Sequence, residues 1–189
     1  MKILRILSRL RQHRCKLESL PNIVVKASPN YYKAFTAPNP TFEATIHSAT
    51  GDQVGTVTYA LSPLSDRVYI FDIQIAPEHR RCGYGTALLW HLARVYGQPI
   101  TAVKELYSAS RFWSAARQQK GTGFVVTEQL SVSEMDVEAA RWEHLRPAAE
   151  RLEKVMTERL TVHREPWHVA VGRGLEATEP PPLEWKMNQ

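Results

Sequence analysis

A turn between an apolar segment and an amphipathic segment carries the residues best suited to chemistry. It holds Arg80, Arg81, Gly83 and Gly85, and residues 73–89 around it indicate a strand that leads directly into a helix. The first backbone N–H groups of a helix have no partner within it, and with the helix dipole they attract an anion. Glycine lets a phosphate approach closely, and arginine adds positive charge. The sequence therefore predicts a phosphate site.

Other reactive motifs are missing from the sequence. The turn lacks the Gly-Lys-Ser or Gly-Lys-Thr ending of a Walker loop and the spaced glycines of a dinucleotide site, which excludes nucleotide hydrolysis. No Gly-x-Ser-x-Gly nucleophile turn occurs, and a packing role is expected for Cys82. His163 and His168 are too irregularly spaced for a helical zinc pair, and no metal is expected.

Three strand-like segments precede the turn. Residues 41–48 and 54–61 flank the turn-forming residues 48–52, which predicts an antiparallel hairpin. Residues 67–75 are more continuously apolar, as expected of a central strand covered on both faces. After the turn, apolar residues recur at helical spacing over residues 86–96, and a glycine and a proline then end the helix.

The chain continues to alternate between strands and helices. A strand is expected over residues 99–103, a helix over 108–120 and another strand over 124–127, which indicates an α/β fold. The region 133–160 is charged and helical, and residues 167–171 are the candidate for a last strand.

Positive charge is concentrated at the start of the chain. The 189 residues have a formal net charge of +5, and residues 1–18 hold six basic residues against Glu18 alone. The remainder balances, so a wholly basic nucleic-acid-binding domain is not expected. Apolar residues recur at helical spacing between Ile3 and Leu10, which predicts an amphipathic leader helix able to dock on nucleic acid, a membrane surface or a protein partner.

The composition favours a single cytoplasmic domain. Two distant cysteines, Cys15 and Cys82, imply no disulfide framework. No apolar stretch approaches the ~20 residues of a membrane-spanning helix, and arginines interrupt the leader where a secretory signal is apolar.

The phosphate turn resembles the signature of the GNAT superfamily of acyl-CoA-dependent N-acyltransferases, Arg/Gln-x-x-Gly-x-Gly/Ala between a central strand and a helix. Arg80-Arg-Cys-Gly-Tyr-Gly85 matches it. The resemblance implies a mixed, mostly antiparallel central sheet flanked by helices, with a helical extension in the C-terminal third. Residues 1–18 are then the leader, 19–127 the acyl-CoA-binding core, and 128–189 helices, a last strand and a tail of the same domain.

The resemblance also implies how acetyl-CoA is bound. In the family, backbone amides across the turn bind the pyrophosphate of coenzyme A, and the preceding strand pairs with the pantetheine arm. The implied function is transfer of an acetyl group from acetyl-CoA to a primary amine by direct attack on the thioester. The residues implied to bind the coenzyme are Ile73, Gln74, Ile75, Arg80, Arg81, Cys82, Gly83, Tyr84, Gly85 and Thr86.

Two positions depart from the family pattern. Arg81 and Cys82 stand where many members have glycine and a basic residue. Residues 109–113 look like the family's second helix, where a tyrosine is commonly placed near the departing thiolate, and Trp113 takes its place. An indole N–H donates a hydrogen bond but is no practical general acid near neutral pH. The alternatives for protonating the thiolate are water, Ser108, Ser110 or Tyr107.

A base that takes a proton from the amine is useful to this reaction. Asp72, inside the third strand, is the leading candidate and Glu43 the second, although a solvated or salt-bridged strand residue is the alternative for Asp72.

The acceptor stays open between a small-molecule amine, a protein amino group and an aminoacyl-tRNA. Its pocket is expected in residues 28–40, in residues 62–66 and in the C-terminal part. The alternative to an enzyme is a non-catalytic acyl-CoA-binding or interaction module docked through residues 1–18. Formation of a homodimer is also left open.

Overall fold

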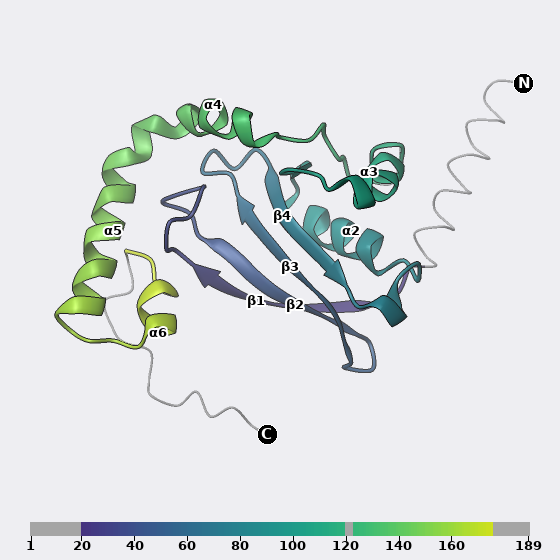
Figure 1. Ribbon diagram of the computed structural model, residues 1–189, viewed down its shortest axis with the longest axis horizontal. Coiled ribbons are helices and arrows are strands. Elements are labelled where there is room, and N and C mark those ends of the chain that lie inside the picture. The colour runs from purple at the N-terminus through teal and green to yellow at the C-terminus, as the bar shows by residue number, and fades with distance from the viewer. Residues whose placement is uncertain (1–19, 120–122, 176–189) are drawn as a thin grey trace, which may run out of the picture.

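A five-stranded sheet forms the centre of the protein (Figure 1). The computed structural model describes residues 20–119 and 123–175, so the predicted leader over residues 1–18 and the end of the tail lie outside the described residues. The first four strands are antiparallel neighbours in chain order, and the fifth is parallel to the fourth. The expected mixed, mostly antiparallel sheet is confirmed. The strands are β1 (Ile23–Asn30), β2 (Thr41–Ser48), β3 (Gln53–Leu61), β4 (Val68–Ile75) and β5 (Ile100–Ala102).

Helices flank this sheet, as expected. The described helices are α2 (Tyr84–Tyr96), α3 (Ser110–Arg117), α4 (Met135–Ala139), α5 (Arg146–Thr161) and α6 (Trp167–Val171). Short 3-10 turns lie at Pro77–His79, Tyr107–Ala109, Val132–Glu134 and Ala140–Leu145. Within the described ranges, no helix is long and apolar enough to cross a membrane.

The main core lies between α2 and one face of the sheet. Leu88, Leu89 and Leu92 recur at helical spacing on α2 and are buried against apolar side chains of β2, β3 and β4. The helix ends at Gly97, whose φ of +67° suits glycine and whose N–H donates to the oxygen of Ala93 at 2.8 Å. This packing fixes the helix that follows the phosphate turn.

The predicted hairpin is confirmed. β2 and β3 pair along their length, and the turn between them closes with a hydrogen bond from the N–H of Ser48 to the oxygen of Asp52 at 2.8 Å. Gly51 adopts a φ of +93°, which explains the glycine in this turn.

The strand β1 was not expected. Residues 28–30, which the sequence suggested as part of a variable loop, instead end a strand that pairs with β2 over eight residues. β1 forms an edge of the sheet, where Pro29 is tolerated because one row of backbone groups needs no partner.

Two of the expected strands are wrong. Residues 124–127 contact β5 through a single parallel bridge between Val126 and Ile100 and form no strand. Residues 167–171 form α6, because Pro166 precedes them and its oxygen accepts hydrogen bonds from Val169 and Ala170 at 3.0 Å. A five-residue apolar run is too short for its periodicity to separate a helix from a strand.

The C-terminal arm, residues 132–174, wraps around the sheet on the side away from α3 (Figure 1). Its Trp142 packs against Phe35 and Tyr69 in a second, smaller core. Further along, the buried guanidinium of Arg159 donates to the oxygens of Arg173 at 2.8 Å and Gly174 at 3.0 Å. These bonds tie the end of the arm to α5.

Candidate active site

The pairing of β4 with its neighbouring strands changes at Phe71. The register with β3 shifts between Thr58 and Tyr59, so Phe71 has no partner there and forms a β-bulge. β5 pairs only with Val68–Ile70. A bulge bends its strand and increases the local twist. Beyond Phe71, β4 therefore runs on without β5 beside it.

This part of β4 has a free edge. The N–H of Ala76 donates to the oxygen of Val54 at 3.0 Å, so alternate residues of the strand turn their backbone groups toward β3. The backbone groups of Ile73 and Ile75 then point to the other edge. Arg80 confirms this direction, because its Nε donates to the oxygen of Ile75 at 3.0 Å. Ile73 thus offers main-chain groups to an extended ligand.

A cleft of about 950 Å³ lies along the free edge. Its walls are β4, the end of β5, the turn before α2 and the start of α3. The proposed base Asp72 and the candidate acid Ser108 line it, whereas Cys82 and Ser110 do not. The other residues predicted to bind the coenzyme all line it: Ile73, Gln74, Ile75, Arg80, Arg81, Gly83, Tyr84, Gly85 and Thr86.

The phosphate turn opens onto one end of the cleft. Gly83 caps α2 with a φ of +88°, and among the described residues no side chain caps the helix. The first bond within α2 runs from the N–H of Ala87 to the oxygen of Gly83 at 2.9 Å. The N–H groups before Ala87 are therefore available to an anion, which is the local geometry of a phosphate site.

Glycine is needed at the two positions of the turn for different structural reasons. A side chain at Gly83 would force a positive φ on a residue that disfavours it and would lie 3.2 Å from Pro21. A Cβ at Gly85 would lie 3.0 Å from the ring of Phe112 on α3. Gly85 therefore permits close packing of α3 on α2, and it is not only a point of ligand approach.

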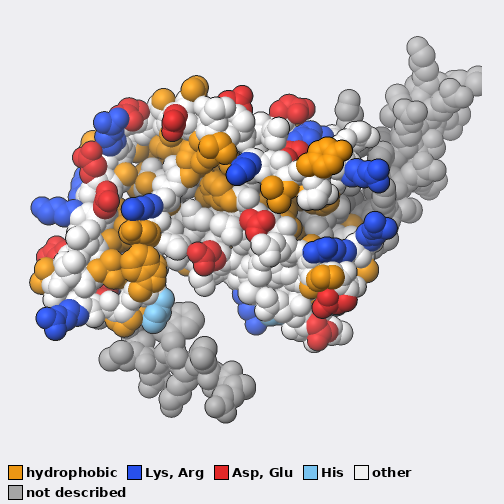
Figure 2. Space-filling view, viewed as in Figure 1, with side chains coloured by type: hydrophobic (Ala, Val, Ile, Leu, Met, Phe, Trp, Pro, Cys, Tyr) orange, Lys and Arg blue, Asp and Glu red, His pale blue; other side chains and the backbone are white. Residues whose placement is uncertain are grey.

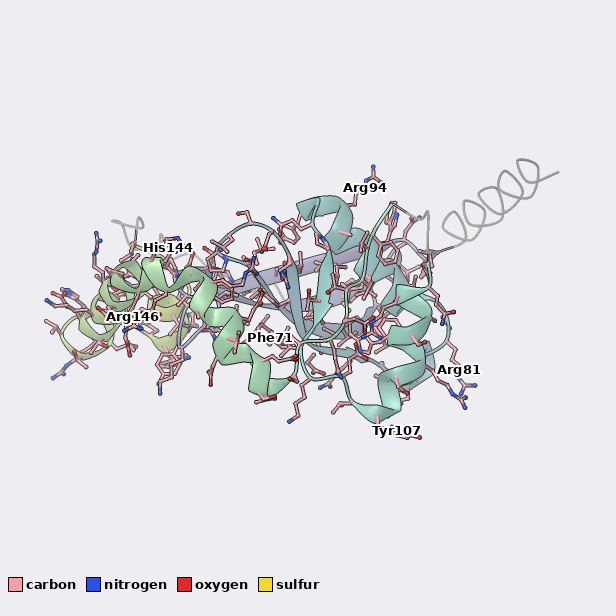
Figure 3. All side chains as sticks on the ribbon, turned by 90° about the horizontal axis from the view of Figure 1, so that it is seen from above. Phe71, Arg81, Arg94, Tyr107, His144 and Arg146 are labelled. Carbon is pink, nitrogen blue, oxygen red and sulfur yellow. The ribbon has the colours of Figure 1, made fainter. Side chains whose placement is uncertain are left out.

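The two arginines of the turn play unequal parts. Both are exposed, but Arg80 is held to the strand through its bond to Ile75, whereas Arg81 extends away from the ribbon (Figure 3). The backbone of Arg81 has a φ of +63°, which costs on the order of 1 kcal/mol in a residue with a side chain. Cys82 is exposed, and its Sγ donates to the oxygen of Arg80 at 3.5 Å.

Asp72 and Glu43 lie on the face of the sheet opposite α2. Cross-strand pairing aligns them in one row with Thr58 between them. Asp72 is exposed and accepts a hydrogen bond from Nε2 of Gln74 at 2.7 Å, and Glu43 accepts one from Asn30 at 3.2 Å. Figure 2 shows acidic side chains in the middle of this face. Of the two carboxylates, only Asp72 lines the cleft.

The candidates for protonating the thiolate are scattered. Tyr107 is 96% exposed and lies outside the cleft wall, and Ser110 lies outside it as well. Ser108 lines the cleft from the turn before α3. Trp113, one turn into α3, lines the cleft and is buried.

The sequence did not single out the segment after β5. Lys104, Glu105 and Leu106 all line the cleft, and Lys104 has a φ of +54°. The carboxylate of Glu105 is ion-paired with Arg117 on α3, which holds the segment against that helix. In the sequence, this segment is marked only by the end of the short apolar run before Lys104. Nothing else distinguishes it from an ordinary loop, so its place in the cleft wall could not be predicted.

The opposite end of β4 is anchored to the C-terminal arm. The hydroxyl of Tyr69 donates to Glu138 at 2.5 Å, and burial together with this carboxylate raises the pKa of Tyr69. Arg141 pairs with both Glu138 and Asp66, and Arg67 lies 3.3 Å from Glu138. These charges fix the start of the strand whose far half borders the cleft.

No metal centre accompanies the cleft in the part of the chain that the structure describes. Within it, no group of three or more His, Cys, Asp or Glu side chains is arranged to hold an ion.

Comparison with known proteins identifies the family. Residues 10–125 match the model of the acetyltransferase (GNAT) family. A crystal structure of nourseothricin acetyltransferase aligns with 43% of this chain at 21% identity and a TM-score of 0.25. That alignment spans 62% of the other protein, which is less than two thirds of its length. Comparison with curated proteins gave no match. Because the family model covers more than half of the chain and includes β1 to β5, α2 and α3, the chain belongs to the GNAT acetyltransferase family.

Proposed function

We propose that this protein is an N-acetyltransferase that moves an acetyl group from acetyl-CoA to a primary amine by direct attack on the thioester. One observation carries the proposal. The free edge of β4 and the uncapped start of α2 border the same cleft, so main-chain groups for an extended arm and N–H groups for phosphates follow one another. Membership of an acetyltransferase family supports acyl transfer in general.

In this proposal, one set of cleft residues binds the pyrophosphate of the coenzyme and another binds its pantetheine arm. The backbone N–H groups from Gly83 to Thr86 bind the pyrophosphate, and Arg81 adds charge from the rim. Ile73 offers backbone groups to the amides of the pantetheine arm. In the proposed arrangement the thioester lies toward the end of the cleft where β4 and β5 diverge, a part lined by Ile70 and Ala102. Cys82 has no role in this arrangement because it does not line the cleft.

The reaction requires a neutral amine beside the thioester. Its nitrogen lone pair attacks the carbonyl carbon, the C–S bond breaks and its electron pair stays on sulfur. The nitrogen loses a proton, which Asp72 accepts directly or through water. Asp72 suits this task because it lines the cleft from the open face of the sheet, so an amine can approach there without displacing the coenzyme.

The proposal is tested by amine-dependent release of free thiol from acetyl-CoA across a panel of amines. Asp72→Asn should lower kcat by about 100-fold or more with little change in acetyl-CoA affinity. Glu43→Gln is the matched control, because it changes a carboxylate of the same row that does not line the cleft. Equal rates for the two variants would remove Asp72 from the mechanism, and no acetyl-CoA binding by the folded protein would overturn the whole proposal.

A non-catalytic acyl-CoA-binding module is the second candidate. It is favoured by Trp113, because an indole does not protonate a thiolate, and Ser108 is then the one nearby hydroxyl of the predicted set on the cleft wall. Binding of acetyl-CoA without thiol release for any amine would support this reading. Release of thiol that depends on an amine would exclude it.

The acceptor side is the open sheet face. Its polar row gives a small-molecule amine or a protein amino group direct access to Asp72, and both classes belong in the panel. Two dispersed cysteines support a reducing cytoplasmic compartment.

A further inference from the structure

Trp113 is a polar side chain buried in the cleft wall. Only 6% of the residue is exposed, and its ring meets that of Phe112 edge-on with centroids 5.0 Å apart. Phe112 in turn lies against Gly85, so this pair joins α3 to the start of α2. The ring of Trp113 is thus held in place by the main core.

The indole N–H of Trp113 has no acceptor among the described residues. Buried tryptophan N–H groups usually find a partner. Some polar atoms of the described residues are fully buried and lack a partner, but the indole nitrogen of Trp113 is not one of them. This unpaired nitrogen therefore keeps some access to open space. The open space beside Trp113 is the cleft. Trp113 is part of the cleft wall, so a ligand in the cleft lies beside this ring.

We propose that Trp113 donates its indole N–H to a carbonyl oxygen of the acyl-pantetheine arm. The inference rests on the proposed function, which places that arm in this cleft. The arm presents two amide carbonyls and one thioester carbonyl, all of them acceptors. The indole N–H is a donor only, so it matches this ligand without exchanging a proton. Trp113 is thus a binding residue at the site where an acid was expected.

The full-length protein labelled with ¹⁵N at its tryptophans gives a direct test. The indole N–H signal of Trp113 should move downfield when acetyl-CoA is added. The matched control is Trp142, which is 5% exposed, packs in the second core and does not line the cleft. Its signal should not move. A shift with both CoA and acetyl-CoA assigns an amide carbonyl as the acceptor, and a shift with acetyl-CoA alone assigns the thioester carbonyl.

The five tryptophans can be assigned by single Trp→Phe variants. If Trp113→Phe does not fold, the other four variants assign Trp113 by elimination. If it folds, acetyl-CoA should bind about two- to tenfold more weakly, as expected for the loss of one hydrogen bond. Trp142→Phe should bind as the unchanged protein does.

In a second sample, labelled uniformly with ¹⁵N, the backbone amide signals of Gly83 and Gly85 distinguish the two ways in which this test can fail. If they shift with acetyl-CoA while the Trp113 indole does not, this inference is wrong and the binding site stands. If neither shifts, the coenzyme is not bound in the cleft, and both the inference and the proposed function are overturned.

Discussion

The two halves of β4 differ in what surrounds them. Val68, Tyr69 and Ile70 are buried, lie between β3 and β5, and are fixed to the C-terminal arm by the charges around Glu138. Residues 73–75 have β3 on one side only, and Gln74 is exposed on the open face. The bulge at Phe71 separates the halves.

This division separates stability from binding along one strand. A strand paired on both edges has no backbone group left for a ligand, whereas a strand with a free edge needs support from elsewhere. β4 combines a free edge with structural support, because its half at Val68–Ile70 is anchored and holds the half at residues 73–75 in position. The labelled residues in Figure 3 show the same order, with Phe71 between Arg81 near the phosphate turn and Arg146 on the arm.

The largest expected effect comes from the anchored half. Ile70→Ala removes a side chain that is 1% exposed and should lower the free energy of unfolding by about 2 to 5 kcal/mol. Gln74→Ala, four residues along the same strand, should change it by less than about 0.5 kcal/mol. Urea unfolding followed by circular dichroism measures both. Similar losses in the two variants would erase the distinction between the halves.

The next effect concerns the turn that continues the free half. Gly83→Ala should cost about 1 to 2 kcal/mol of stability through its positive φ and weaken acetyl-CoA binding about tenfold or more. Gly97→Ala at the other end of α2 has a φ of +67° and an open Cβ position, so it carries a similar backbone cost. Calorimetric titration should find normal binding for Gly97→Ala. A tenfold loss there too would assign the effect to the helix as a whole.

A smaller change separates charge from conformation at the rim of the cleft. Arg81→Gly should stabilise the fold by about 0.5 kcal/mol, because glycine relieves the φ of +63°. The same change should weaken acetyl-CoA binding by about two- to fivefold through loss of an exposed charge, with the difference shrinking at high salt. Arg81→Lys keeps the charge and the backbone cost, so it should bind normally without added stability.

The smallest expected effect is the pH dependence of the anchored end. Burial raises the pKa of Asp66, but hydrogen bonds from Arg141 and Ser62 and the charge of Arg67 outweigh it, so its pKa lies below the usual value. Its contribution is therefore present above the unfolded pKa of about 3.9 and is lost as the pH falls through the lower folded pKa.

Replacement of this aspartate should remove that acid-dependent loss. Asp66→Asn should lose less stability than the unchanged protein between pH 5 and pH 3, as measured by thermal unfolding. Asp136→Asn on α4 is the control and should follow the unchanged protein. An identical pH profile for Asp66→Asn would show that this carboxylate does not hold the anchored end.

The sequence predicted the parts of the site that have local causes. The hairpin, β4, β5 and α2 follow from turn residues and from apolar periodicity, and the phosphate turn follows from its glycines. The bulge at Phe71 leaves no local signal, because it depends on how β3 and β5 meet β4. For the same reason, β4 was wrongly expected to be covered on both faces throughout, although Asp72 and Gln74 are exposed.

Residues that depend on contacts between distant segments were harder to predict. β1 was not predicted, and the proline near its end is acceptable because the strand lies at the edge of the sheet. The role of Gly85 in packing required the position of Phe112, which is distant in sequence.

The position of Pro21 beside Gly83 has a consequence for the start of the described chain. Leu20 and Pro21 lie beside the phosphate turn, at 3.4 Å and 3.2 Å from the position that a Cβ at Gly83 would take. The first described residues of the chain are therefore neighbours of the turn that we propose to bind the pyrophosphate. A substitution at Leu20 or Pro21 would thus change the packing of this turn although neither residue lines the cleft.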